Sequence, residues 1–240
     1  MNIKKYTKPA RKLLKLRYCG AVIVAAGNAS RMGGIDKVMA PLDGEPMIVK
    51  TVRAFQECPA ISEIVIVTRP DLMETIMGLC KKFDKVTCVV TGGADRAESV
   101  HNGLNALSAK VRLAAVQDGA RPLVTWELID RVVRAANTYG AAAPGIAVKD
   151  TTKIVQGGMV ESTPDRSMLR AIQTPQVFDF DILRGALKKA KEEGATITDD
   201  CSAVERLGVR VRIVEGDERN MKVTTPLDLK IAQMLWEEMQ

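Results

Sequence analysis

Residues 21–37 read AVIVAAGNASRMGGIDK, and this stretch decides which fold the chain adopts. Its first five residues are all apolar, which is typical of a strand buried on both faces of a parallel sheet. The loop that follows is rich in small residues and contains two cations, Arg31 and Lys37. Ligands of α/β sheets bind beyond the carboxyl ends of the strands, so this loop is the first place to look for a site.

On either side of the loop, apolar runs of strand length alternate with segments of helical period. We expect further strands at residues 64–67, 86–90 and 113–116, and helices at residues 47–57, 72–81, 96–107 and 126–139. This alternation predicts the α/β class, with a doubly wound, mostly parallel sheet covered by helices on both faces.

The pattern changes after residue 140. Short strand-like pieces at 141–148, 153–155 and 173–178, with a turn at 156–158, predict a β-arm that leaves the sheet. Further elements are expected as helices at 181–193 and 199–207, a strand at 209–214 and a helix at 226–236. The chain therefore divides into a basic N-terminal extension, residues 1–19, and a single domain, residues 20–240, with its arm at about 150–170.

The net charge of +6 is concentrated in the extension. Residues 1–19 contain seven basic and no acidic side chains, whereas the remainder has 28 basic and 29 acidic ones. A near-neutral body with 4% aromatic residues argues against nucleic-acid binding. We expect the extension to be a solvated arm, although Leu13, Leu14 and Leu16 leave a membrane-surface or partner-binding helix open.

Cysteine and histidine usage excludes several kinds of chemistry. The five cysteines form no C-x-x-C pair, which argues against a disulfide framework and a zinc site and favours a cytoplasmic protein with reduced thiols. His101 is the only histidine, which argues against a hydrolase with a Ser-His-Asp triad. No apolar run approaches the length of a membrane span, and none resembles a signal peptide.

The first loop suits a phosphate group. The small residues Ala25, Ala26 and Gly27 let the backbone approach phosphate oxygens, and Arg31 and Lys37 could flank a triphosphate. The loop is neither a Walker A sequence nor a G-x-G-x-x-G fingerprint. On these residues alone, phosphate binding and plain packing both remain open.

Five segments together resemble one family. The first loop resembles the nucleotidyltransferase signature A-A-G-x-G-x-R-M-x(n)-K, and four more segments follow in the order of the same family: 92–100 (GGADRAESV), 118–122 (DGARP), 173–176 (QTPQ) and 220–224 (NMKVT). The set, spanning about residues 20–238, resembles the 2-C-methyl-D-erythritol 4-phosphate cytidylyltransferase family of the non-mevalonate isoprenoid pathway.

The resemblance implies a reaction, a fold and an assembly. The enzyme would transfer CMP from CTP to 2-C-methyl-D-erythritol 4-phosphate and release pyrophosphate, with Mg²⁺ or another divalent cation. The fold would be the Rossmann-like nucleotidyltransferase fold. The protein would form a homodimer in which the arm crosses to the partner's site, and its ligands would be small molecules, with no nucleic acid and no membrane.

The resemblance also assigns roles to residues. Arg31 and Lys37 would stabilise the transition state, with Lys222 and Arg166 as the further catalytic cations. CTP would be bound by a set of small residues: Ala25, Ala26, Gly27, Gly92, Gly93, Ala94 and Ser99. A phosphate nucleophile is already ionised, so the reaction needs no general base.

The remaining assignments concern the substrate. Asp118 and Arg121 would grip ribose, metal or polyol hydroxyls, and Asp118 is the possible metal ligand. Thr151 and Thr174 would hold the polyol phosphate, together with Arg166. Each has a plainer alternative: a turn at 92–94, a structural Asp118–Arg121 ion pair, a surface Lys222 and a solvated Arg166.

The chain departs from the family pattern at several positions. Asp36 and Val38 flank Lys37 where proline and glutamine are usual, Gln117 replaces a histidine, and residues 28–30 lack the second glycine. A carboxylate beside Lys37 could weaken the local positive potential or orient the lysine.

Two other functions compete with this interpretation. Ribitol-5-phosphate cytidylyltransferases share the chemistry but usually carry L-A-G-G in the first loop. Here Ala25-Ala26-Gly27 and residues 194–200 (GATITDD) are closer to the erythritol-phosphate enzyme. A non-catalytic nucleotide sensor is disfavoured because Arg31, Lys37 and Lys222 are retained.

Overall fold

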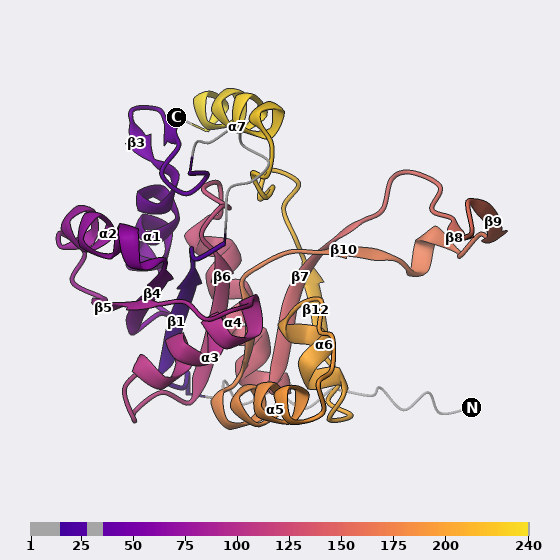
Figure 1. Cartoon of the computed structure of the whole chain (residues 1–240), viewed down its shortest axis with the longest axis horizontal. Helices are drawn as coiled ribbons and strands as arrows, with labels where there is room; N and C mark the ends of the chain where they lie inside the picture. The colour runs from indigo at the N-terminus through magenta and orange to yellow at the C-terminus, as the bar shows by residue number, and fades with distance from the viewer. Residues whose placement is uncertain (1–14, 28–35, 240) are drawn as a thin grey trace, which may run out of the picture.

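An eight-stranded sheet forms the centre of the molecule in the computed structural model, which describes residues 15–27 and 36–239 (Figure 1). Its strands are β1 (Cys19–Val24), β4 (Glu63–Thr68), β5 (Val86–Thr91), β6 (Leu113–Asp118), β7 (Ala141–Ala147), β10 (Arg170–Ile172), β11 (Gln176–Asp179) and β12 (Arg212–Glu215). The order is β10-β7-β11-β6-β1-β4-β5, and β12 pairs with β7.

Parallel pairing dominates this sheet, as the sequence predicts. β1 lies between β4 and β6 and is parallel to both, with Val22 opposite Val65 and Val116. β5 continues the parallel set beyond β4, and β12 is parallel to β7. Only β10 and β11 run antiparallel to their neighbours. The carboxyl ends of β1, β4, β5 and β6 therefore meet at one edge.

Helices cover both faces of the sheet. One face packs against α1 (Met47–Glu57), α2 (Met73–Cys80) and α4 (Trp126–Tyr139), and the other against α3 (Arg96–Ala106), α5 (Phe180–Glu192) and α6 (Asp200–Glu205). A third apolar cluster joins α7 (Pro226–Glu238) to the short strand β2 (Pro41–Leu42), which pairs with β3 (Glu45–Pro46). The doubly wound prediction is confirmed.

Some element boundaries differ from the predicted ones. The strand expected at 209–214 begins only at Arg212, and residues 173–175 form the turn between β10 and β11. The β2–β3 ribbon was not predicted, because two-residue strands show no apolar alternation. Its turn places Asp43 and Gly44 at positive φ.

The arm leaves the sheet after β7 and returns at β10 (Figure 1). It contains the hairpin of β8 (Ile154–Gln156) and β9 (Met159–Ser162), with a turn at Gly157 and Gly158 that both have positive φ. A short 3-10 helix, η2 (Arg166–Met168), follows. Every residue of the hairpin strands is exposed, so the hairpin packs against no other element in the described part of the chain.

The described part of the N-terminal segment is anchored at Arg17. Its guanidinium donates to Asp179 Oδ2 (2.8 Å) and to the Ala136 carbonyl (3.2 Å), while its backbone N–H and Nε both donate to Asn137 Oδ1 (3.1 Å each). β1 begins two residues later, at Cys19. The solvated arm expected from the sequence falls largely on residues 1–14, outside the described residues.

Replacing Arg17 with alanine is expected to lower the free energy of unfolding by about 1–2 kcal/mol. The change removes the charge-assisted hydrogen bonds of the guanidinium to Asp179 and to the Ala136 carbonyl, while the backbone N–H of residue 17 still donates to Asn137. Urea unfolding measures the loss. Arg184→Ala is the matched control, because it removes an exposed ion pair with Asp181 and an exposed cation–π contact with Phe180, and should change stability by less than about 1 kcal/mol. Equal losses in the two variants would contradict the anchoring role.

Candidate active site

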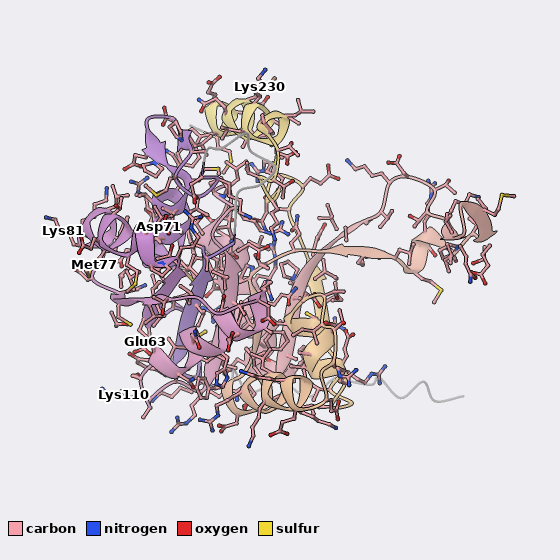
Figure 2. The ribbon with its side chains drawn as sticks, viewed as in Figure 1. Glu63, Asp71, Met77, Lys81, Lys110 and Lys230 are labelled. Carbon is pink, nitrogen blue, oxygen red and sulfur yellow. The ribbon has the colours of Figure 1, made fainter. Side chains whose placement is uncertain are left out.

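A cavity of about 410 Å³ lies at the carboxyl ends of β1, β4, β5 and β6. This edge of the sheet can be found in Figure 2 from two labelled residues: Asp71 lies just beyond the carboxyl end of β4, and Glu63 lies at the amino end of β4. The lining residues come from six separate segments: Val24, Ala25, Ala26, Gly27, Lys37, Arg69, Gly93, Ala94, Asp95, Arg96, Ser99, Asp118, Gly119, Ala120 and Lys222. The sequence predicted most of these segments as site loops.

Backbone hydrogen bonds tie the loops together beyond the ends of the strands. Ala25 N–H donates to the Val67 carbonyl (2.7 Å), and Gly119 N–H donates to the Val24 carbonyl (2.8 Å). Gly92 N–H donates to the Thr68 carbonyl (2.8 Å). The edges of the cavity are therefore fixed by backbone hydrogen bonds that continue those between the strands of the sheet.

Gly92 is required by a close contact and does not itself line the cavity. A Cβ added there would lie 2.4 Å from Ala26 Cβ and 3.0 Å from Ser99 Oγ. Both distances are shorter than ordinary van der Waals contact. The absent side chain thus allows the first loop and the 92–95 turn to pack directly on each other.

The 92–95 turn is organised by its own side chains. Ser99 Oγ is buried, accepts from Gly93 N–H (3.0 Å) and donates to the Asp95 carbonyl (2.8 Å). Asp95 caps α3 by accepting from Glu98 N–H (2.8 Å), and Glu98 in turn accepts from Ala94 N–H (2.8 Å). The turn expected as the plain alternative is real, and it also lines the cavity.

Asp118 is the acidic centre of the cavity. Lys222 Nζ lies 3.0 Å from its Oδ2, Arg121 Nε lies 3.3 Å from the same oxygen, and Arg96 Nε lies 3.8 Å from its Oδ1. Burial works to raise the pKa of Asp118, but Lys222, Arg96 and Arg121 outweigh it and lower the pKa below the ordinary value. The carboxylate is therefore ionised at neutral pH.

Arg121 and Thr174 support this centre from inside the protein. Arg121 Nη1 donates to the Asn220 carbonyl (2.7 Å), which fixes the segment that carries Lys222. Thr174 Oγ1 accepts from Asp118 N–H (3.1 Å), and Asn220 Nδ2 donates to the Thr174 carbonyl (2.9 Å). Both residues are buried and neither lines the cavity, so their contacts are with the protein.

Lys37 lines the cavity beside the first loop. A Cβ built on Gly27 would lie 3.5 Å from Lys37 Nζ, so the ammonium group lies against that loop. The neighbouring Asp36 forms an ion pair with Arg69 and accepts from Val38 N–H (3.0 Å). The carboxylate that replaces the family's proline is therefore paired with Arg69 and helps to fold the turn that carries Lys37.

Two cations of the site, Arg69 and Arg96, were missed by the sequence analysis. Arg69 lines the cavity and bonds Asp71 (2.9 Å) as well as Asp36. Arg96 also lines it and forms an ion pair with the buried Asp200 (2.7 Å). Arg69 and Arg96 both follow a strand end by a few residues, and that position was the signal that could have found them.

Two predicted residues lie on the arm, away from the cavity. A third, Arg31, falls outside the described residues. Thr151 and Arg166 are exposed on the arm and do not line the cavity, and Arg166 Nη1 donates to the Lys149 carbonyl (2.9 Å). Within one chain, the structure brings together most of the residues predicted to bind the nucleotide, but not Thr151 and Arg166 of the arm.

Comparison with known proteins identifies the family. The family model described as 2-C-methyl-D-erythritol 4-phosphate cytidylyltransferase matches residues 19–238. The chain belongs to this family. The resemblance drawn from the five motifs is thereby confirmed, and the chain is a cytidylyltransferase, an enzyme of the nucleotidyltransferase class.

Relatives and solved structures agree with this membership. The cytidylyltransferase of this name from Symbiobacterium thermophilum is 46% identical over 90% of this chain and 92% of its own length. That from Caldanaerobacter subterraneus is 44% identical over 89% and 96%. The crystal structure of 4-diphosphocytidyl-2C-methyl-D-erythritol synthase from Anaerococcus prevotii has a TM-score of 0.84 at 30% identity, covering 92% of this chain and 96% of that one.

Membership weighs against both competing functions of the sequence analysis. The matched family is named for the erythritol phosphate and not for ribitol phosphate, and its members are named as transferases and not as sensors. Within residues 15–27 and 36–239, no helix has the length and apolarity needed to cross a membrane.

Gly92→Ala is expected to lower both stability and CTP affinity. The added methyl group must displace Ala26 or Ser99, at a cost of about 1–3 kcal/mol, and any shift of Ala26 moves the first loop. Urea unfolding and calorimetric titration with CTP measure the two effects. The control is Gly78→Ala, an exposed helical glycine with open space around it, which should stabilise the protein by up to about 1 kcal/mol and leave CTP binding unchanged. Wild-type CTP affinity in Gly92→Ala would show that the close contact has no part in the site.

Proposed function

We propose that the chain transfers CMP from CTP to 2-C-methyl-D-erythritol 4-phosphate in the cavity around Asp118. One observation carries this proposal: Lys37 and Lys222, from opposite ends of the chain, line the same cavity as the first loop. A nucleotidyl transfer needs fixed cations on both sides of the reacting phosphorus, and this arrangement supplies them.

The charge balance of the cavity supports a triphosphate ligand. Four basic side chains line it against two acidic ones: Lys37, Arg69, Arg96 and Lys222 against Asp95 and Asp118. A positive balance in a partly enclosed site favours a ligand with several negative charges, because the surrounding protein screens the charges less than water does.

The reaction is a substitution at the α-phosphorus of CTP. A phosphate oxygen of the polyol phosphate forms the new bond, the bond to the bridging oxygen breaks, and pyrophosphate leaves with the electron pair. Lys37 and Arg31 stabilise the negative charge that builds on the α- and β-phosphates. Lys222 holds the attacking phosphate, while its contact with Asp118 fixes its position. The nucleophile is already ionised, so no side chain has to remove a proton.

The small residues of the cavity bind the nucleotide through their backbone. Ala25, Ala26 and Gly27 present the loop after β1 to the triphosphate. Gly93 and Ala94 border the cavity with Ser99, and they supply the polar groups for the cytosine edge. Backbone recognition explains why these positions hold small side chains.

A divalent cation fits the residues that are present. Asp118 supplies an ionised carboxylate inside the cavity, and Mg²⁺ commonly binds through one or two carboxylates plus substrate phosphates. The described residues contain no cluster of three or more His, Cys, Asp and Glu side chains that could hold a metal by themselves. Asp118 and the phosphates of CTP would therefore hold the ion, which supplies charge neutralisation when bound.

Lys37→Ala and Arg31→Ala are each expected to lower kcat about 100- to 1,000-fold, or about 3–4 kcal/mol, with a much smaller change in KM for CTP. The reason is that a transition-state cation acts mainly where charge builds up. Pyrophosphate release from CTP with the erythritol phosphate measures both constants. Lys230→Ala, on the outer side of α7, is the control and should keep wild-type values (Figure 2). A rise in KM with unchanged kcat would assign the two cations to ground-state binding.

We also propose a homodimer in which the arm completes the partner's site. The hairpin carries large apolar side chains that are exposed by 50–76%: Ile154, Val155, Met159 and Val160. A lone two-stranded hairpin is marginal in water, so a second copy is needed to cover it. Arg166 and Thr151 do not reach the cavity of their own chain, which is consistent with a role in the partner's cavity.

Mixing two inactive variants tests this exchange. Lys37→Ala and Arg166→Ala proteins are dissociated and reassociated together, and about half of the dimers become mixed. Each mixed dimer has one doubly damaged site and one intact site, so about a quarter of all sites should recover. Mixing two batches of Lys37→Ala is the control and should restore nothing. No recovery in the mixed sample, or a monomer in solution, would contradict arm exchange.

Two further assignments remain proposals. We treat residues 20–240 as one catalytic domain, with the arm at about 150–170 and the basic extension at 1–19 outside the catalytic machinery. A cytoplasmic location is supported by the five cysteines, all of which are free thiols.

A further inference from the structure

The turn that begins α6 carries a buried carboxylate with no assigned role. Residues 194–200 resemble the family, yet the reaction described above uses none of them. Asp200, the last of them, is fully buried, and its Oδ2 accepts from Arg96 Nη2 at 2.7 Å. Arg96 lines the cavity, so Asp200 is linked to the cavity through a single side chain.

The position of Asp200 is fixed by its neighbours on both sides. Asp199 forms a capping box with Ser202 and also accepts from Gln176 Nε2 (2.8 Å). Gln176 Oε1 accepts from Cys201 N–H (3.0 Å). Because Gln176 begins β11, which pairs with β6, the carboxylate is held in register with the strand that ends at Asp118.

Stability does not explain this ion pair. Removing a carboxylate from water is unfavourable, and a buried ion pair is often no more stabilising than apolar side chains of similar volume. Asp200 Oδ1 has no hydrogen-bond partner in the described part of the chain, so the desolvation of that atom is not compensated. Burial raises the pKa of Asp200, and Arg96 counteracts the rise. The pair therefore needs an explanation at the site.

Two carboxylates compete for the Arg96 guanidinium. Its Nη2 lies 2.7 Å from Asp200, whereas its Nε lies 3.8 Å from Asp118 Oδ1. The shorter contact is thus with Asp200, and Arg96 approaches Oδ1 of Asp118, whereas Lys222 contacts Oδ2. Without Asp200, the guanidinium would be drawn onto Asp118 and would neutralise the group that is available to ribose or a metal ion.

We propose that Asp200 is a positioning residue for nucleotide binding: it holds the Arg96 guanidinium at the cavity wall, facing CTP and withheld from Asp118. The proposal rests on the proposed function, because it takes CTP as the ligand of the cavity. It predicts that Asp200 acts on CTP only through Arg96.

A four-protein comparison tests this prediction. CTP affinity is measured by calorimetry for the wild type, Asp200→Asn, Arg96→Met and the double variant. Asp200→Asn is expected to weaken CTP binding about 10- to 100-fold, by analogy with the loss seen when the group that orients a metal ligand is removed. The double variant should bind CTP as Arg96→Met does, because the Asp200 effect is lost once Arg96 is absent. Independent, additive effects of the two changes would overturn the proposal.

Folding is controlled separately. Thermal unfolding is recorded for each protein. If Asp200→Asn does not fold, Arg96→Met is compared with the double variant instead. A further loss of CTP affinity in the double variant then overturns the proposal. Asp179→Asn is the matched control, since it breaks the Arg17 ion pair at the other end of the sheet (2.8 Å) and should leave CTP affinity unchanged. Loss of CTP affinity in this control equal to that in Asp200→Asn would also overturn it.

The two proposals fail differently. Wild-type protein that binds CTP but releases no pyrophosphate with the erythritol phosphate would refute the proposed reaction, while the four affinities would still test Asp200. Wild-type protein that binds no CTP would refute both.

Discussion

The parallel pairing of β1 with β4 on one side and β6 on the other is the constraint on which the rest of the structure depends. It brings three carboxyl ends to one edge, and its hydrogen bonds continue past the strands, from Ala25 to Val67 and from Gly119 to Val24. The loops that bear the site are therefore extensions of a rigid sheet. Catalytic groups placed in this way are held in position before the substrate arrives, which is the condition for electrostatic catalysis.

Three of the cations that line the cavity are each held in place by a carboxylate. Arg69 is paired with Asp36 and Asp71, Arg96 with Asp200, and Lys222 with Asp118. Such pairing reduces the positive potential of the cavity. It also orders these long side chains before the nucleotide binds, so binding does not have to pay the entropy cost of ordering them. The ion pairs therefore lower the net charge of the cavity and fix the geometry of its cations.

Much of the fold could be predicted because the strands are continuous apolar runs, whereas polar segments carry less information. Lys37, Lys222 and Asp118 were predicted as site residues and do line the cavity. Arg69 and Arg96 could not be singled out, because a cation in a polar loop looks solvated until the order of the strands is known. Arg121 and Thr174 belong to the right motifs, but only tertiary contacts reveal that both are buried and bond the backbone.

The central place of β1 in the sheet has a consequence for synthesis on the ribosome. β1 is the first strand of the described chain to emerge. One of its edges stays unpaired until β4 is made, and the other until β6 is made, which begins at Leu113. At about 5–20 residues per second, the interval before β6 emerges is roughly 5–20 s. For that time an apolar strand has an open edge, and such edges pair readily with other chains. Residues 19–24 of the nascent chain are thus a segment that a chaperone would be expected to shield.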